Sequence, residues 1–188
     1  MGKKDEIINA TMELILEIGF SNFSIGKTAN KLNVSKGVIT YHFPTKDLLL
    51  QAVVMKYYEE AAIYMAKHMR VDKNATDALN SYIESNMSFV NEKKVQTIAI
   101  ADIIFNSRTP EGKILFKEDK SIYNPLIEIF KYGCEVERIY RDFSPEIMAR
   151  SVRSVIDSMS LAIARDEITD VDNAIREVQK IFEFATLK

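Results

Sequence analysis

Residues 33–46 read NVSKGVITYHFPTK, and this stretch decides the fold. It predicts a short helix over residues 36–42 with a boundary signal at each end. Ser35 is a residue type that accepts hydrogen bonds from the free amides at a helix N-terminus. Pro44 ends the helix, because the residue before a proline avoids the helical region. Asn33 tolerates the left-handed conformation that closes a preceding helix.

A second short helix is predicted immediately upstream, over residues 25–32, with Ser24 as its N-cap. Ala29 is small and lies in the middle of that helix, where another helix must approach closely. Val34 and Ile39 are apolar and can pack back against it. Two short helices joined in this way form a helix-turn-helix, whose second helix enters a DNA major groove with its N-terminal half toward the bases.

The second helix of this motif offers several groups to a duplex. Ser35 and the first helix amides can donate to a phosphate, and Lys36 can reach a phosphate or a guanine edge. Gly37 has no Cβ, so the helix backbone can come close to the DNA. Four further side chains can donate to phosphates beside the groove, namely Thr40, Tyr41, His42 and Lys46.

Each of these assignments has a plainer alternative. His42 can instead cap the helix beside Phe43 without touching DNA, and Tyr41 can be part of the core. Lys27 is also a candidate DNA contact, although simple solvation is the alternative for it and for Lys31.

The charge distribution supports contact with DNA at one end of the protein. The net charge of the 188-residue chain is −2, which by itself argues against a nucleic-acid partner. The segment 24–46, however, contains four lysines and one histidine and no acidic residue. A local basic patch on an otherwise acidic body is typical of a protein that touches DNA with a single surface.

Apolar residues recur at spacings of three and four along nearly the whole chain, which predicts an all-α fold of about nine helices. The chain should divide into a helix-turn-helix DNA-binding domain, residues 1–46, and an effector-binding and dimerisation domain, residues 47–188. Phe43 and Leu48 are expected in the core between the first and fourth helices. Besides the two short helices, helices are expected near residues 3–18, 46–69, 74–91, 94–106, 111–134, 145–166 and 171–186.

Composition argues against catalysis and cofactors. The chain has two histidines and one cysteine, too few for a zinc site of four His or Cys ligands. No nucleophile elbow and no glycine-rich phosphate loop occurs. A single cysteine excludes an intrachain disulfide and fits a reducing cytoplasm. No apolar run approaches the ~20 residues that a membrane span needs, and the N-terminal residues MGKKDEII do not form a secretory signal.

Residues 3–50 resemble the TetR family of bacterial transcriptional regulators. The resemblance is carried by ILEIGFSNFSI at the end of the first helix and by KLNVSKGVITYHFPTKDLL. It implies a homodimer that binds a palindromic DNA operator, with a C-terminal helical domain for a small-molecule effector. It also implies that nine positions match the family's DNA contacts: Ser24, Ser35, Lys36, Gly37, Val38, Thr40, Tyr41, His42 and Lys46.

Three positions depart from the family pattern. Thr40 stands where many members have a tyrosine, which shortens one phosphate contact. Thr28 replaces an aliphatic residue, and Asn33 replaces a glycine. None of these changes conflicts with the geometry of the motif, but the second half of the chain matches the family only in length and helical pattern.

The effector domain is expected to hold a mainly apolar and aromatic pocket. Polar residues inside apolar runs are informative, because a buried carboxylate costs several kcal/mol unless it is paired. Asp102 and Asp157 therefore lie on a solvated stripe, pair with a neighbour such as Arg153, or belong to a ligand site. The candidate ligand-binding residues are Tyr82, Asn86, Phe89, Asp102, Asn106, Tyr123 and Asp157.

The last two predicted helices are expected to form the dimer interface as a four-helix bundle. The helix 145–166 would offer Ile147, Ser151, Val155, Ser158, Met159 and Ala162. The helix 171–186 would offer Val171, Ile175, Val178, Phe182 and Ala185. The expected function is a repressor that leaves its operator when a small hydrophobic or amphipathic ligand binds. A transcriptional activator, or a ligand-independent helical adaptor protein, is the alternative.

Overall fold

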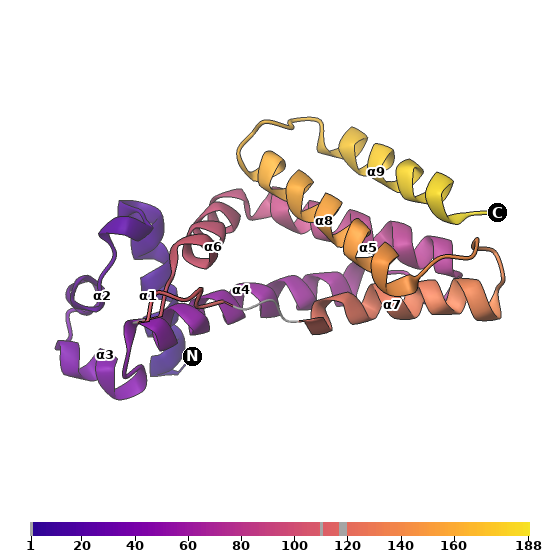
Figure 1. The fold of residues 1–188 in the computed structure, drawn as a ribbon. Helices are drawn as coiled ribbons and strands as arrows, with labels where there is room; N and C mark the ends of the chain where they lie inside the picture. Colours follow the sequence, from indigo (N-terminus) through magenta and orange to yellow (C-terminus); the bar gives the residue numbers. More distant parts are fainter. Residues whose placement is uncertain (1, 110, 117–119) are drawn as a thin grey trace. The chain divides into compact units, whose positions relative to one another are not determined.

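The computed structural model describes residues 2–109, 111–116 and 120–188, and within them it contains nine α-helices and no β-strand (Figure 1). Short helical turns lie at Phe20–Asn22, Lys120–Tyr123 and Tyr132–Val136. None of the described helices is long and apolar enough to cross a membrane. The α-helices are α1 (Lys3–Ile18), α2 (Ile25–Lys31), α3 (Lys36–His42), α4 (Lys46–His68), α5 (Ala75–Glu92), α6 (Lys94–Asn106), α7 (Asn124–Lys131), α8 (Pro145–Ala164) and α9 (Val171–Thr186).

The predicted all-α class is confirmed, but the helix expected over residues 111–134 was wrong in its first half. The backbone after α6 forms a tight turn instead, with an antiparallel bridge between Arg108 and Ile114. Gly112 has a φ of 77°, and its amide donates to the carbonyl of Thr109 at 2.8 Å. Such a left-handed residue cannot continue a helix. Residues 117–119 of the expected helix lie outside the described residues.

The chain forms two compact units. The first contains residues 1–60 and 95–117, and the second contains residues 61–94 and 118–188. Both units include part of α4, because the division falls inside that helix between residues 60 and 61. The division into functional domains at residues 46 and 47 stays a prediction.

The core of the first unit holds the helix-turn-helix together. Ile7 of α1, Ile39 of α3 and Leu49 of α4 are completely buried. Phe43 is also buried, as predicted, but the prediction for Leu48 was wrong, because its side chain is 46% exposed. Thr28, which replaces an aliphatic residue of the family pattern, is buried with a polar partner. Its hydroxyl lies 3.5 Å from the hydroxyl of Thr11.

The second unit is a helical bundle centred on α5. The helix α8 packs on α5 and α7, and α9 packs on α5 and α8 (Figure 1). The inner face of α9 is buried within its own protomer, through Val171, Ile175, Val178 and Phe182. The assignment of these four residues to a dimer interface was therefore wrong. Their spacing identifies an apolar face, and that face covers α5 and α8.

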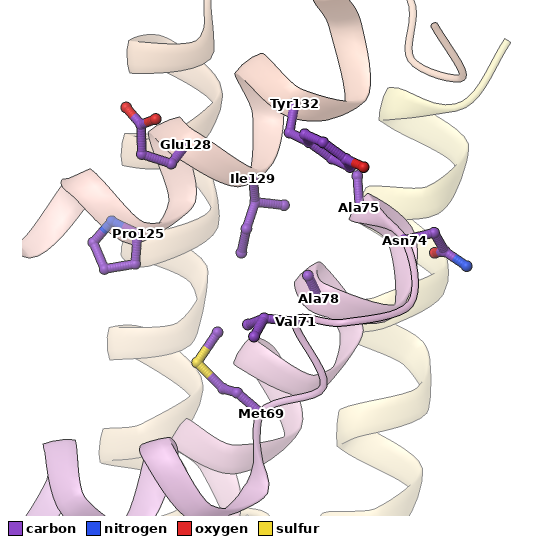
Figure 2. Close-up of a pocket in the computed structure, with 9 residues that line it drawn as sticks. All are labelled: Met69, Val71, Asn74, Ala75, Ala78, Pro125, Glu128, Ile129 and Tyr132. Atoms are coloured by element: carbon purple, nitrogen blue, oxygen red, sulfur yellow. The ribbon is translucent and has the colours of Figure 1, made fainter. Parts of the chain in front are cut away.

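A pocket of about 290 Å³ opens in this unit between the first turn of α5 and α7 (Figure 2). The chain that follows α4 forms one wall, through Met69 and Val71. On the opposite side Ile129 of α7 points toward Met69 (Figure 2).

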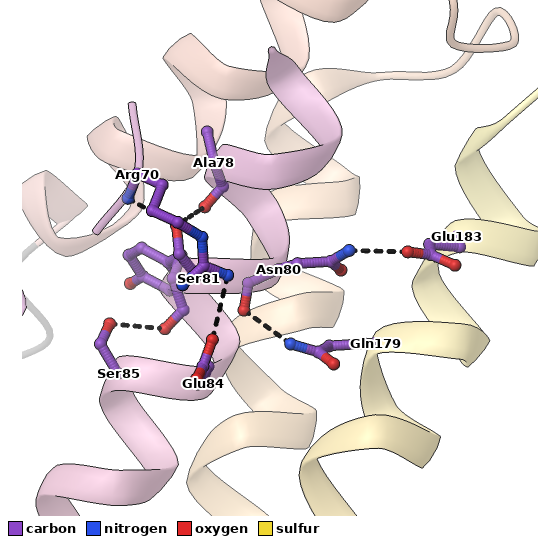
Figure 3. A network of polar contacts seen from close by, with 9 residues as sticks. Arg70, Ala78, Asn80, Ser81, Glu84, Ser85, Gln179 and Glu183 are labelled. Atoms are coloured by element: carbon purple, nitrogen blue, oxygen red, sulfur yellow. Dashed lines mark hydrogen bonds and ion pairs between the residues drawn. The ribbon is translucent and has the colours of Figure 1, made fainter. Parts of the chain in front are cut away.

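Polar contacts tie α5 to its neighbours on two sides (Figure 3). On one side the Ser81 hydroxyl accepts from the amide of Arg70 at 2.9 Å, and the Arg70 guanidinium pairs with Glu84 at 3.1 Å. On the other side the Asn80 amide donates to Glu183 of α9 at 2.6 Å. These bonds fix the register of α5 against both neighbouring segments.

Gly133 is required by close packing in the second unit. A Cβ at this position would lie 2.3 Å from Cδ2 of Tyr140 and 3.0 Å from the Cβ of Ala75. Tyr140 is only 2% exposed, so its ring has no room to move away from an added Cβ. The short π-turn Tyr132–Val136 brings the backbone this close to the ring.

We predict that Gly133→Ala lowers the free energy of unfolding by about 1–3 kcal/mol, because overpacking a rigid core displaces its neighbours. Gly26→Ala is the matched control, since a Cβ there comes no closer than 4.0 Å to the Ser24 hydroxyl. The control should keep its stability or gain up to about 1 kcal/mol from helix propensity. Urea unfolding of both variants measures the difference, and equal stabilities would contradict this account of Gly133.

Candidate nucleic-acid interface

The turn between α2 and α3 takes the predicted conformation. Asn33 has a φ of 52°, which is left-handed, and the Val34 amide donates to the carbonyl of Ala29 at 3.0 Å. Ala29 is buried at 2% exposure, so its small side chain allows α3 to pack against α2. The predicted bounds of α3 are confirmed, from Lys36 to His42.

One face of α3 is buried against the protein and the opposite face is exposed to solvent. Ile39 is completely buried and Phe43 closes the C-terminal end of the helix. Tyr41, in contrast, is 83% exposed, and its ring meets the His42 ring edge-on with centroids 5.1 Å apart. An aromatic ring this exposed contributes little to the core, so the structure disfavours the core alternative for Tyr41.

The N-terminal half of α3 is open to solvent. Ser35, Lys36 and Gly37 are all exposed. Ser35 is the N-cap residue by position, but its side chain accepts no capping hydrogen bond, contrary to the predicted cap. Within the described residues Lys36 is placed in no ion pair. These groups can therefore turn to an external acceptor or donor.

Gly37 is not required by the packing of the protein itself. An added Cβ would have the Ser35 hydroxyl at 3.6 Å as its nearest neighbour, which is an ordinary contact. Its backbone is that of a regular helix. The missing side chain leaves a smooth patch of backbone on the outer face of α3, where a second molecule can approach closely.

Other predicted contacts are already engaged within the protein. The Ser24 hydroxyl accepts from the Lys27 amide at 3.3 Å, which confirms its capping role. The Lys27 ammonium donates to the carbonyl of Asn22 at 2.8 Å. The Thr40 hydroxyl donates to the carbonyl of Lys36 at 3.2 Å, along its own helix. Thr40 must give up this internal hydrogen bond to donate to a phosphate, whereas Ser24 keeps its hydroxyl proton and Lys27 keeps two ammonium protons for such a contact.

The basic stretch carries less free charge than its composition suggests. The Lys31 ammonium contacts Glu17 at 2.5 Å and Glu13 at 3.6 Å, and the hydrogen bond to Glu17 raises the pKa of this lysine. The Lys46 ammonium lies 5.3 Å from the centroid of the Phe20 ring and 5.2 Å from that of Phe23. Sequence reasoning missed both arrangements, because the partners come from α1 and from the turn that follows it.

Among the ten predicted DNA-binding residues the structure thus distinguishes three groups. Ser35, Lys36, Gly37 and Tyr41 are exposed, and their side chains form no hydrogen bond or ion pair within the described residues. Internally bonded are Ser24, Lys27, Thr40 and Lys46. Half-buried on the flanks of α3 are Val38 and His42.

The predicted ligand-binding residues are not gathered around one cavity. Asp102 and Asn106 are exposed and belong to the first compact unit, whereas the other five belong to the second. Tyr123 lies beneath the Arg150 guanidinium, 4.5 Å from the ring centroid, and Phe89 is buried beside Tyr64. None of the seven lines the pocket shown in Figure 2.

Three of these residues meet a side chain that the candidate set did not contain, namely Arg153 of α8. Its guanidinium contacts Asp157 at 2.7 Å and Asn86 at 3.2 Å, and it also interacts with Tyr82. Burial lowers the pKa of Arg153, but Asp157 and Tyr82 outweigh that effect and the pKa is raised. Of the three alternatives that the sequence left open for Asp157, the structure shows the pairing with Arg153.

No cluster of three or more His, Cys, Asp or Glu side chains is placed to hold a metal ion in the described parts of the chain.

Comparisons with known proteins agree with this geometry. The family model described as "Bacterial regulatory proteins, tetR family" matches residues 7–53, which contain α2 and α3. The HTH-type transcriptional regulator BetI of Proteus mirabilis is 22% identical over 183 residues, covering 95% of this chain and 87% of the relative.

Solved structures share the fold over the full length. A TetR transcription regulator from Haloarcula marismortui aligns with a TM-score of 0.81 at 21% identity, covering 98% of each chain. The transcriptional regulator FadR from Bacillus subtilis, solved in complex with stearoyl-CoA, aligns with a TM-score of 0.76 at 20% identity, covering 95% of this chain and 97% of FadR. Residues 7–53 thus match the DNA-binding region of TetR-family regulators, and the described chain shares the fold of solved TetR-family transcriptional regulators.

Proposed function

We propose that this protein is a homodimeric repressor that binds a palindromic operator and leaves it when a small molecule binds. The observation that carries the proposal is the solvent-exposed face of α3. The packing of the protein does not require a glycine at position 37, and the Tyr41 ring on this face is not buried in the core. Ser35 and Lys36 extend this face with donors for phosphates and bases. The internally bonded residues Ser24, Lys27, Thr40 and Lys46, with Val38 and His42, flank the same face.

A homodimer is supported by an exposed apolar face on the last two helices. Ile147 of α8 is 64% exposed, and Ile181 and Phe184 of α9 are 55% and 78% exposed. Exposed serines, Ser151 and Ser158, follow Ile147 along α8 and leave room for a second helix. Two copies of this helix pair would form a four-helix bundle and cover the apolar side chains.

A two-fold dimer presents two copies of α3 to the same face of a duplex. These copies fit successive major grooves when they are separated by about 34 Å or a multiple of one helical turn. A ligand that binds only the dimer with another separation shifts the population away from the DNA-binding state. FadR, one of the structural neighbours, was crystallised with stearoyl-CoA, which supports small-molecule control for this fold.

We predict that Gly37→Ala separates folding from DNA binding. The fold should be unchanged or stabilised by up to about 1 kcal/mol, because alanine favours a helix and meets no closer atom than the Ser35 hydroxyl. Affinity for DNA should fall about tenfold or more, because the added methyl group lies on the surface that approaches the duplex. Thermal unfolding and fluorescence anisotropy measure the two effects, using a duplex that the wild-type protein has selected from a randomised pool.

Lys36→Ala and Tyr41→Ala should lose affinity in the same assay without a change in thermal stability, because both side chains are exposed. Lys73→Ala is the matched control, since Lys73 is an exposed lysine of the second compact unit. Unchanged affinity in all three α3 variants would contradict the proposed interface.

We predict that Phe184→Asp produces a folded monomer with much weaker operator binding, because an aspartate in the centre of an apolar interface leaves a buried charge unpaired. Ile63→Asp is the matched control, because Ile63 is an apolar side chain of α4 that is 58% exposed and lies outside the α8–α9 face. Analytical ultracentrifugation reports the oligomeric state and circular dichroism reports the fold. A dimeric Phe184→Asp variant would show that another surface joins the protomers.

A further inference from the structure

The pocket of the second compact unit has a chemical character that narrows its ligand. Nine residues line its volume of about 290 Å³, which is near the lower limit for small-molecule sites. They come from the segment after α4, the start of α5, and one face of α7 with the turn that follows (Figure 2). The lining residues are Met69, Val71, Asn74, Ala75, Ala78, Pro125, Glu128, Ile129 and Tyr132.

The inner surface of the pocket is apolar. Ala75, Ala78 and Ile129 are buried at 2%, 5% and 8% exposure, and Met69 faces Ile129 across the space (Figure 2). Methionine adapts its shape to the molecule it contacts, because its unbranched side chain has low rotational barriers. A ligand therefore gains affinity here by burying an apolar body.

The rim of the pocket carries negative charge and an aromatic ring. Glu128 is the one formally charged residue among the nine, and no lysine, arginine or histidine of the described residues lines the pocket. Tyr132 is 49% exposed at the rim, where its ring is accessible to a ligand. A carboxylate or phosphate ligand would have no cationic partner among the lining residues, whereas an organic cation meets both a carboxylate and an aromatic ring.

The Glu128 carboxylate is available for such a ligand. Its present partner is Lys131, one turn further along the chain, at 3.5 Å. Both side chains are largely exposed, at 74% for Glu128 and 44% for Lys131. An exposed ion pair of this kind contributes little stability, so a cation held at the rim can replace the lysine.

The walls of the pocket are fixed in position before any ligand binds. The Glu137 carboxylate accepts a hydrogen bond from the Ala75 amide at 2.8 Å, which ties the start of α5 to the turn after α7. Gly133 and Tyr140 pack beside the same alanine. A preformed site avoids the entropic cost of ordering its walls on binding.

We propose that this pocket is the effector site and that it takes a small organic cation with an apolar body. This inference rests on the proposed function, because it identifies where and by what the regulator is controlled. The ligand's apolar body lies between Met69 and Ile129, and its cationic group replaces the Lys131 ammonium beside Glu128. Met69 directly follows α4 (Lys46–His68), and both compact units include part of that helix, so the ligand contacts the chain next to a helix that also belongs to the DNA-binding unit.

The test uses full-length protein and the benzyltrimethylammonium ion as the probe, with neopentylbenzene as its uncharged carbon analogue and phenylacetate as an anionic counterpart. Methionine methyl groups are labelled with ¹³C, and the Met69 signal is assigned from a Met69→Leu variant. The cation should shift the Met69 signal and bind more tightly than either counterpart. Glu128→Gln should weaken its binding roughly fivefold, the change expected when one partly exposed charge contact is lost.

Two further variants sharpen the test. Lys131→Gln should strengthen binding of the cation, because it releases Glu128 from its present partner. Glu135→Gln is the matched control and should have no effect, since Glu135 is exposed nearby but does not line the pocket. A cation that fails to bind, leaves Met69 unshifted, or binds equally to wild type and Glu128→Gln overturns the proposal.

Affinity for the selected duplex is measured in the same samples, so the two proposals can fail separately. Loss of DNA binding upon addition of the cation supports both the site and its regulatory role. Binding at Met69 without release of DNA would preserve the ligand class and refute control through this pocket. A protein that never binds a duplex would refute the proposed function, whatever the probe does.

Discussion

Burial of Ile39 beneath α3 is the constraint on which the DNA-binding surface depends. The helix has only seven residues, too few to be stable alone in water. It persists because Ile39 is completely buried, Phe43 closes its end, and the left-handed Asn33 directs it back onto Ala29. A helix anchored along one side necessarily exposes the other side, and that exposed side carries the unengaged groups.

The lysines near this helix divide between structural and exposed roles. Lys31 pairs with acids of α1 and Lys46 lies against two phenylalanine rings, so both help to hold the first unit together. Lys36 alone of the four in this stretch has no side-chain hydrogen bond, ion pair or aromatic contact within the described residues, since the Lys27 ammonium donates to the carbonyl of Asn22. We therefore attribute more of the DNA affinity to Lys36, the amides at the start of α3 and Tyr41 than the lysine count suggests. The salt dependence of binding should correspondingly reflect few neutralised phosphates per subunit.

Local signals in the sequence were sufficient to predict the helix-turn-helix. Ser24, Asn33 and Pro44 each act on their own backbone or on the next few residues, so the helix boundaries that they set can be predicted without knowledge of the fold. The bounds of α3 and the left-handed turn were predicted correctly for this reason. The first half of the helix expected over residues 111–134 is absent because the turn at Gly112 is closed by a bridge between Arg108 and Ile114, a pairing that the spacing of apolar residues does not reveal.

Long-range contacts could not be predicted from one sequence. The spacing of Val171, Ile175, Val178 and Phe182 correctly indicates an apolar helix face, but it does not say whether that face covers the same protomer or another. The candidate ligand residues failed to define a cavity for a similar reason. Asp157 is a carboxylate within an apolar run because it pairs with Arg153, not because it lines a ligand site. The pocket lies at the ends of helices, where the sequence around Met69 and Tyr132 shows no pattern that would indicate a binding site.

Photo-crosslinking from position 41 tests the central claim most directly. Benzoylphenylalanine replaces Tyr41, whose 83% exposure allows the larger side chain without disturbing the fold, and the protein is irradiated with a pool of random duplexes at low ionic strength. The same residue at position 132, in the second compact unit, provides the comparison. We predict covalent protein–DNA adducts from position 41 and none from position 132. Adducts from position 132 alone, or from neither position, would contradict the assignment of α3 as the surface that reads DNA.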